Sequence, residues 1–138
     1  MRKVRKRIEI RSSDLAVVRL PGNRGRGVCA LKSIQKGSLI EQAPVIVIPS
    51  EEKHLIEQTV LWDRWFTWGH NEQDLAIALG FGGLYNHSYE PNAICHGSER
   101  LRKLEFVALR DIEADEEITI NYNGEPEDNA PVWFDIES

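Results

Sequence analysis

Short stretches in which apolar and polar residues alternate recur along this chain. In Lys103–Leu109 and Ile118–Tyr122, for example, every second position carries an apolar or aromatic side chain. A period of two is typical of β-strands with one buried face. On this basis, strands are predicted at Arg7–Arg11, Leu15–Arg19, Val28–Leu31, Leu39–Gln42, Val45–Ile48, Lys103–Leu109 and Ile118–Tyr122.

The pattern changes between Ser50 and Trp68, where the apolar residues follow a helical spacing. Ser50 is the predicted N-cap, and Glu51 and Glu52 suit the positive first turn of a helix. A further apolar run, Asp74–Leu79, is followed by a glycine-rich stretch. One modest helical insert among many short strands indicates a mainly β architecture.

One segment of the chain is echoed later in the sequence. Ala30–Ile40 matches Ala108–Ile118 in register, and each copy has the pattern of a strand, a tight turn and a second strand. Gly37 and Asp115 occupy the same place in the two turns, where a left-handed residue is expected. The echo predicts two similar hairpins in one β fold.

Length and composition describe an ordinary globular protein. The chain has 138 residues, and one domain commonly spans about 100–150, so we expect a single domain over residues 1–138. Its hydrophobic content of 41% and charged content of 28% argue against general disorder. No apolar run reaches the ~18 residues that cross a bilayer, so no membrane partner is expected.

The cysteines and the basic start of the chain bear on its location. Cys29 and Cys95 are too few for a disulfide framework or a cysteine-rich zinc site. The first seven residues carry the charge of a signal peptide, but Ile8–Arg11 follows in place of an apolar region. We therefore expect a cytoplasmic protein.

The net charge of −5 conceals an asymmetry between the ends. Residues 1–11 hold six basic residues and one acidic residue, whereas residues 111–138 hold ten acidic residues and no Lys or Arg. A basic end can contact nucleic acid and an acidic end can attract a basic peptide. Alternatively, both ends are simply solvated, and direct nucleic-acid binding rests on the basic end alone.

A glycine-rich loop is predicted at Pro21–Gly27. Gly25–Ala30 fits the dinucleotide fingerprint formally, but that motif needs a helix that begins at the glycines. Val28–Leu31 has the pattern of a strand instead, so a Rossmann fold is rejected. The loop suits either a close approach to a flat ligand or a structural turn, and spacing does not separate the two.

The densest polar segment is Asn86–Asn92, which follows an apolar and glycine-rich run. Such a cluster is expected to be buried, and buried Asn and His side chains need hydrogen-bond partners. An ordinary turn with a surface histidine is the alternative. A serine-hydrolase site is disfavoured because no Gly-x-Ser-x-Gly segment occurs, and the histidines and cysteines lack the spacing of a metal site. No metal is expected.

The third segment is Glu116–Tyr122, whose alternation places Ile118, Ile120 and Tyr122 on one face of a strand. Tyr122 is either a core tyrosine with a hydroxyl that reaches a surface group, or a phenol that orients a reacting atom. The segment alone does not decide between them.

In their order along the chain, Gly25–Val28, Asn86–Asn92 and Glu116–Tyr122 resemble the motifs of the SET-domain protein-lysine methyltransferases. The resemblance runs from about Gly22 to Phe134 and is closest to small stand-alone bacterial and viral members. It implies a SET-type β-clip with short sheets, a helical insert and a C-terminal pseudoknot that brings Asn86 and His87 beside Tyr122. It also implies S-adenosylmethionine as the methyl donor and a lysine side chain as the acceptor.

The resemblance assigns roles by position. Tyr122 matches the catalytic tyrosine. The chain has no cysteine-zinc tail, and Trp133 and Phe134 lie where zinc-free relatives place an aromatic lid. The residues implied to bind the cofactor are Arg24, Gly25, Arg26, Asn86, His87, Trp133 and Phe134. The residues implied to line the lysine channel are Phe66, Trp68, Phe81, Tyr85 and Ile120, although an ordinary aromatic core would explain the aromatic ones equally well.

The chemistry of methyl transfer explains why no nucleophile or metal is visible. A lysine has a pKa of ~10.4, so an apolar channel must favour its neutral form, and alignment of donor and acceptor supplies most of the rate. The expected partner is a protein whose target lysine lies in a basic segment. Because Ile120 brings no hydroxyl, we expect products beyond monomethyl-lysine. The alternative function is a catalytically weak module that binds a peptide or cofactor in the same groove.

Overall fold

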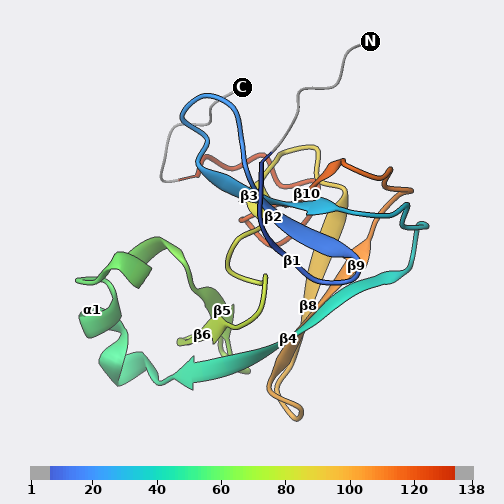
Figure 1. Cartoon of the computed structure of the whole chain (residues 1–138). Coiled ribbons are helices and arrows are strands. Elements are labelled where there is room, and N and C mark those ends of the chain that lie inside the picture. The colour runs from blue at the N-terminus through green and yellow to red at the C-terminus, as the bar shows by residue number, and fades with distance from the viewer. Residues whose placement is uncertain (1–6, 133–138) are drawn as a thin grey trace. The chain divides into compact units, whose positions relative to one another are not determined.

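The computed structural model describes residues 7–132, and of residues 9–11 only the backbone. These residues divide into two compact units. Figure 1 labels the helices and strands and colours the chain by residue number. The first unit comprises residues 7–40, 84–94 and 107–132, and the second comprises residues 41–83 and 95–106. The expected single domain over residues 1–138 stays a prediction, and the lid residues Trp133 and Phe134 lie outside the described residues.

The first unit contains a five-stranded sheet. Its order is β1 (Arg7–Arg11), β2 (Leu15–Arg19), β3 (Arg26–Ala30), β10 (Glu117–Ile120) and β7 (Asn86–His87). β10 is antiparallel to β3 and parallel to β7. A late segment of the chain is therefore inserted between two strands that precede it in sequence, and this insertion places Thr119 opposite Asn86 and Ile120 opposite His87.

The core of this sheet lies on β2 and β3. Four of the five β2 residues are buried, and Ala16, Val18, Leu20 and Cys29 form one packed cluster. In β10 burial alternates as the sequence predicts, since Ile118 and Ile120 are buried and their neighbours are partly exposed. β1 and β2 have the predicted bounds.

The echoed segments lie in the first unit and pair with each other. Ile34 and Ile112 exchange two backbone hydrogen bonds of 2.8 Å. Equivalent bonds flank this centre symmetrically: Asp115 N–H donates to the Ala30 carbonyl, and Gly37 N–H donates to the Ala108 carbonyl. Gly37 and Asp115 have the predicted left-handed conformation, with φ of 84° and 71°. The expected pair of separate hairpins is wrong, because the ladder runs between the copies.

Most residues of another five-stranded sheet belong to the second unit. Its order is β5 (Phe66–Trp68), β6 (Asp74–Ala78), β4 (Leu39–Ile48), β9 (Lys103–Ala108) and β8 (Ala93–Ser98). The helical insert consists of three short pieces, η1 (Ser50–Glu52), α1 (Lys53–Ile56) and η2 (Val60–Asp63). The predicted mainly β fold with a helical insert is confirmed, but the insert ends before Trp68, which belongs to a strand.

Several predicted boundaries are corrected. Arg26 and Gly27 begin β3 and do not belong to the preceding loop. The two strands expected on either side of Pro44 form the single strand β4, where the Pro44 carbonyl accepts from Leu79 N–H. Ser50 is not an N-cap, because Pro49 holds that position and Ser50 N–H donates to Asp74 Oδ1 at 2.9 Å.

The strands β5, β7 and β8 were not expected from the sequence pattern. Across residues 7–132, none of the helices has the length and apolar character needed to span a membrane.

Candidate active site

Tyr122 lies two residues after the end of β10, and both its backbone N–H and its hydroxyl are hydrogen-bonded. Its N–H donates to His87 Nδ1 at 3.0 Å, and its hydroxyl donates to the Tyr85 carbonyl oxygen at 2.6 Å. The pairing of β10 with β7 fixes this arrangement, and Ser88 N–H adds a bond to the Ile120 carbonyl. The structure thus brings Tyr122 beside Asn86 and His87, as the resemblance implies.

His87 is buried and lies between two aromatic rings. Its centroid is 4.5 Å from that of Tyr89 and 5.3 Å from that of Tyr122. Burial lowers the pKa of His87 from its usual 6.5. Because Nδ1 accepts from Tyr122 N–H, the neutral ring carries its proton on Nε2. The imidazole therefore serves as a neutral acceptor that fixes the backbone at Tyr122.

A second polar cluster joins Arg24, Asn86 and Glu117. Arg24 Nη2 donates to Glu117 Oε1 at 2.8 Å, and Asn86 Nδ2 donates to Glu117 Oε2 at 2.8 Å. Asn86 Nδ2 also donates to the Arg26 carbonyl at 2.9 Å. Sequence reasoning placed Arg24, Arg26 and Asn86 around one ligand but gave Glu117 no role. No local sequence pattern distinguishes this glutamate from one that faces solvent.

Two glycines of the loop and strand have different reasons to be glycine. Gly25 has φ of 73°, and a Cβ there would contact nothing within 4 Å, so its backbone faces open space. Gly27 is packed, because a Cβ would lie 2.8 Å from Glu117 Oε2 and 2.9 Å from Asn86 Nδ2. The loop is thus open at Gly25 and closely packed at Gly27.

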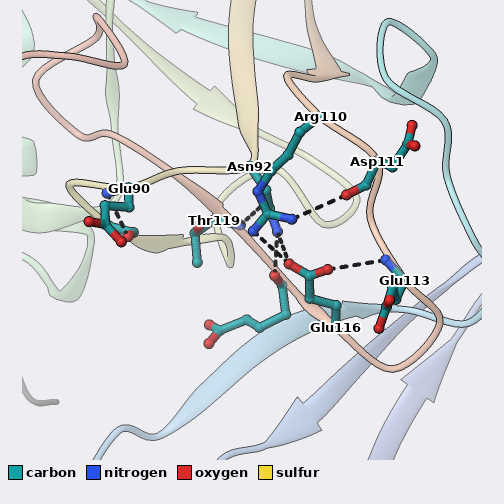
Figure 2. Close-up of polar contacts among 9 residues, drawn as sticks. Glu90, Asn92, Arg110, Asp111, Glu113, Glu116 and Thr119 are labelled. Atoms are coloured by element: carbon teal, nitrogen blue, oxygen red, sulfur yellow. Dashed lines mark hydrogen bonds and ion pairs between the residues drawn. The ribbon is translucent and has the colours of Figure 1, made fainter.

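A third network of hydrogen bonds holds the residues at the entry into β10 (Figure 2). Asn92 is only 2% exposed, donates to Glu116 Oε2 and to the Glu117 carbonyl, and accepts from Thr119 N–H. Arg110 Nη2 donates to Glu116 Oε2 at 2.7 Å. Burial alone raises the pKa of Glu116, but the bonds from Arg110, Glu113 N–H and Asn92 outweigh it and lower that pKa.

The predicted channel residues divide between the two units. In the first unit, Tyr85 and Ile120 are buried. In the second, Trp68 is buried, Phe66 packs edge-on against Phe106 at 6.2 Å, and Phe81 N–H donates to Glu41 Oε2. A lysine channel lined by these five residues stays a prediction.

Metal chemistry has no evident donor set in the described part of the chain. Within residues 7–132, no group of three or more His, Cys, Asp and Glu side chains is placed to hold a metal ion. Burial raises the pKa of the Cys95 thiol to about 12, so this cysteine is held as a neutral thiol at ordinary pH.

Comparison with known families decides the identity of this site. The family model described as SET domain matches residues 25–123, which include all three motifs. The chain belongs to the SET-domain family. Its catalytic class follows from the family: it is a protein-lysine N-methyltransferase that uses S-adenosylmethionine. This confirms the predicted family, fold, reaction and cofactor, and it favours the enzyme over the binding module.

Individual SET proteins resemble the chain over most of its length. The histone-lysine N-methyltransferase of Schizosaccharomyces pombe named as H3 lysine-37 specific is 32% identical over 136 residues, which cover 98% of this chain and 82% of that protein. The crystal structure of a candidate histone methyltransferase of Plasmodium falciparum is 28% identical with a TM-score of 0.61, covering 80% of this chain and 94% of that one.

More distant structures share the fold. A chain of a humanized mutant of the Chaetomium thermophilum Polycomb Repressive Complex 2 superposes with a TM-score of 0.66 at 20% identity. The match covers 78% of this chain and 14% of that chain. At this identity the match supports the fold and carries no statement about substrate.

Proposed function

We propose that Tyr122 is the catalytic residue of this methyltransferase and that Arg24, Gly25, Arg26, Asn86 and His87 bind its cofactor. The observation that carries this proposal is the double attachment of Tyr122, through its N–H to His87 and through its hydroxyl to the Tyr85 carbonyl. A tyrosine fixed in this way holds its phenol oxygen at one place beside the Asn86–His87 segment. Such fixed polar groups favour a transition state without reorganisation.

The donor set of the first unit fits S-adenosylmethionine. Both N–H groups of the Asn86 amide are used by Arg26 and Glu117, so the amide offers its oxygen as an acceptor for an ammonium or amino group. Arg24 is partly exposed and keeps further N–H donors for a carboxylate. The open backbone at Gly25 permits close approach of a flat ligand. Trp133 and Phe134 are proposed to cover the site.

When bound, S-adenosylmethionine supplies a methyl group on a sulfonium that an amine can displace. The chain's part is to hold the phenol of Tyr122 and the carbonyl oxygen of Tyr85 in fixed positions, 2.6 Å apart. The phenol proton is donated to that carbonyl, which fixes the direction of the O–H bond. These oxygens orient the reacting groups, and orientation accounts for much of the rate in such a displacement.

We propose a lysine within a basic protein segment of the histone class as the acceptor. The exposed side chains of Asp111, Glu113, Asp115, Glu125 and Glu127 give residues 111–128 an acidic surface. Such a surface raises the local concentration of a cationic peptide, and salt screens the attraction. The names of the yeast and Plasmodium relatives support the same class.

The proposed number of methyl groups is more than one. Ile120 lies two residues before Tyr122, is 4% exposed, and carries neither a hydroxyl nor a ring. It therefore cannot hold a water by a side-chain hydrogen bond at this position. A partly methylated amine can then rotate for a second transfer.

The experiment incubates the protein with labelled S-adenosylmethionine and either core histones or an acidic protein mixture, at low and high salt. We expect label on histone lysines, less at high salt, and dimethyl-lysine in mass spectra under excess cofactor. The matched variant Ile120→Tyr should shift the products toward one methyl. Cofactor binding without any label transfer would favour the alternative binding module, and equal labelling of acidic proteins would contradict the substrate class.

A further inference from the structure

The side chain of Glu117 lies where two of the proposed cofactor-binding segments meet. Each of its two oxygens accepts a hydrogen bond from a different residue. Oε1 accepts from Arg24 Nη2 and Oε2 accepts from Asn86 Nδ2, both at 2.8 Å. These partners are 93 and 31 residues away along the chain. The Glu117 side chain is only 14% exposed, so its carboxylate is oriented by these two partners more than by water. One side chain therefore ties the glycine loop, β7 and β10 together.

The packing around Glu117 leaves it little freedom. Gly27 lies beneath the carboxylate, and a Cβ there would come within 2.9 Å of Asn86 Nδ2 and of Leu20 Cδ1. Real Cβ contacts are longer than this, so the close approach depends on glycine. Strand pairing adds a second constraint, because Glu117 is opposite Cys29 in β3. The positions of both carboxylate oxygens are thus fixed by backbone as well as by hydrogen bonds.

We propose that Glu117 is a positioning residue for the cofactor, acting through Arg24 and Asn86. By taking one N–H of the Asn86 amide, it sets the amide so that the oxygen is left for the ligand. By pairing with one end of the Arg24 guanidinium, it balances that charge and fixes the direction of the remaining donors. The inference rests on the proposed function, since it assumes that Arg24 and Asn86 contact the cofactor.

The pair with Arg24 is expected to matter more for orientation than for stability. The Arg24 side chain is 31% exposed, and ion pairs that face solvent add little to folding stability. A substitution that removes the charge of Glu117 should therefore change cofactor affinity more than thermal stability. This expectation separates a positioning role from a purely structural one.

The neighbouring residue Glu116 offers a matched control. It has the same side chain one position earlier, but it accepts from a different set of partners, namely Arg110, Asn92 and Glu113 N–H (Figure 2). Within residues 7–132, its hydrogen bonds go to these three residues and not to Arg24 or Asn86. The two glutamates thus separate support of the strand from support of the cofactor-binding side chains.

The test measures Kd for S-adenosylmethionine by calorimetry, together with KM, kcat and Tm, in the wild type, Glu117→Gln and Glu116→Gln. For Glu117→Gln we expect a Kd raised about tenfold, the size of one lost charged hydrogen bond. Its kcat at saturating cofactor should stay within about threefold, since lost uniform binding appears in KM. For Glu116→Gln we expect a lower Tm and an unchanged Kd.

A double-mutant cycle with Arg24→Met tests whether Glu117 affects cofactor binding through Arg24. If Glu117 acts through Arg24, then Glu117→Gln should weaken binding less in the Arg24→Met background than in the wild type. Glu117→Asp keeps the charge with a shorter reach and should give an intermediate Kd, which keeps the test decisive if Glu117→Gln does not fold.

The inference would be overturned if the effects of Glu117→Gln and Arg24→Met on Kd were additive, or if Glu117→Gln and Glu116→Gln had equal Kd values. In either case, an active wild type would leave the proposed function intact. A wild type that does not bind the cofactor would overturn the proposed function itself.

Discussion

The two units of this chain differ in where they place polar and apolar side chains. Among the described residues, the buried polar side chains belong to His87, Asn92 and Asn121, all in the first unit. Each has a hydrogen-bond partner within that unit. In the second unit, Leu55, Val60 and Trp62 are large apolar side chains that are at least half exposed. Among the described residues, the first unit thus contains the buried polar side chains, and the second contains the large apolar side chains that are at least half exposed.

This difference between the units shows that the buried polar residues fix the positions of their neighbours, whereas the exposed apolar residues do not. A buried polar group is costly unless its partners are in place, so His87 and Asn92 allow essentially one arrangement of their neighbours. That arrangement fixes Tyr122 and the start of β10. Exposed apolar side chains on short helical pieces impose no such constraint. Substitutions in the two units should therefore have effects of very different size and kind.

The largest effect is expected for Tyr122→Phe. The variant keeps the ring beside His87 but loses the hydroxyl that donates to the Tyr85 carbonyl. Loss of one fixed polar contact at a reacting centre costs on the order of 10²-fold in kcat. Single-turnover assays should show this loss, while calorimetry shows an unchanged Kd for S-adenosylmethionine. Turnover at the wild-type rate would remove Tyr122 from the catalytic role.

A large loss of stability is expected for Asn92→Ala. This buried amide donates to Glu116 Oε2 and the Glu117 carbonyl and accepts from Thr119 N–H. Its removal leaves buried backbone groups without partners, which costs about 2 kcal/mol in the free energy of unfolding. Urea unfolding followed by circular dichroism measures the change. A loss below half of this value would mean that water replaces the amide and that the network does not set the register.

The first unit could be predicted from the sequence better than the second. β1 and β2 both have the predicted bounds because their own residues mark them. In β1 apolar and polar residues alternate, and β2 is an apolar run that ends at Arg19. β7 has only two residues, Asn86 and His87, and it exists because β10 pairs with it. No local pattern encodes such a pairing between segments about 30 residues apart. The same limit explains why each echoed segment was expected to form a hairpin within itself, whereas the two segments pair with each other through Ile34 and Ile112.

The candidate site was predicted through its motifs and not through its contacts. Arg24, Asn86, His87 and Tyr122 were found by position, and the structure places them in hydrogen-bonded clusters. The role of Glu117 was missed, because a glutamate at the start of a strand has the same local pattern whether it faces water or a buried partner. In the second unit, Trp68 was expected at the end of a helical pattern, but pairing with β6 makes it part of a strand.

A gradual loss of folding stability at acidic pH is expected because of His87. The pKa of His87 is lowered by burial from 6.5, so below pH 6.5 the unfolded chain binds a proton that the folded chain does not. Stability should therefore fall as pH decreases from 6.5 to the folded pKa, and it should not change above that window on account of His87. Protonation of Nδ1 also removes the acceptor of Tyr122 N–H, so activity should fall as pH decreases through the lowered pKa of the folded protein, at the acid end of that window.

Thermal unfolding at several pH values compares the wild type with His87→Asn. The variant should lose most of the slope that the wild type shows just below pH 6.5. The carboxyl of Glu116 does not interfere, because its pKa is lowered from 4.5 and its stabilisation is lost only at more acidic pH. An equal slope in both proteins would assign the acid effect to other groups.

The smallest effect is expected in the helical insert of the second unit. Val60 is 85% exposed, so Val60→Ala removes almost no buried surface and should change the free energy of unfolding by less than about 0.5 kcal/mol. Val28→Ala is the matched control in the first unit, because the same side chain is 0% exposed there and its truncation should cost about 2 kcal/mol. Parallel urea titrations measure both. A destabilisation by Val60→Ala as large as that by Val28→Ala would show that the exposed apolar residues also hold their unit together, and the contrast between the two units would then fail.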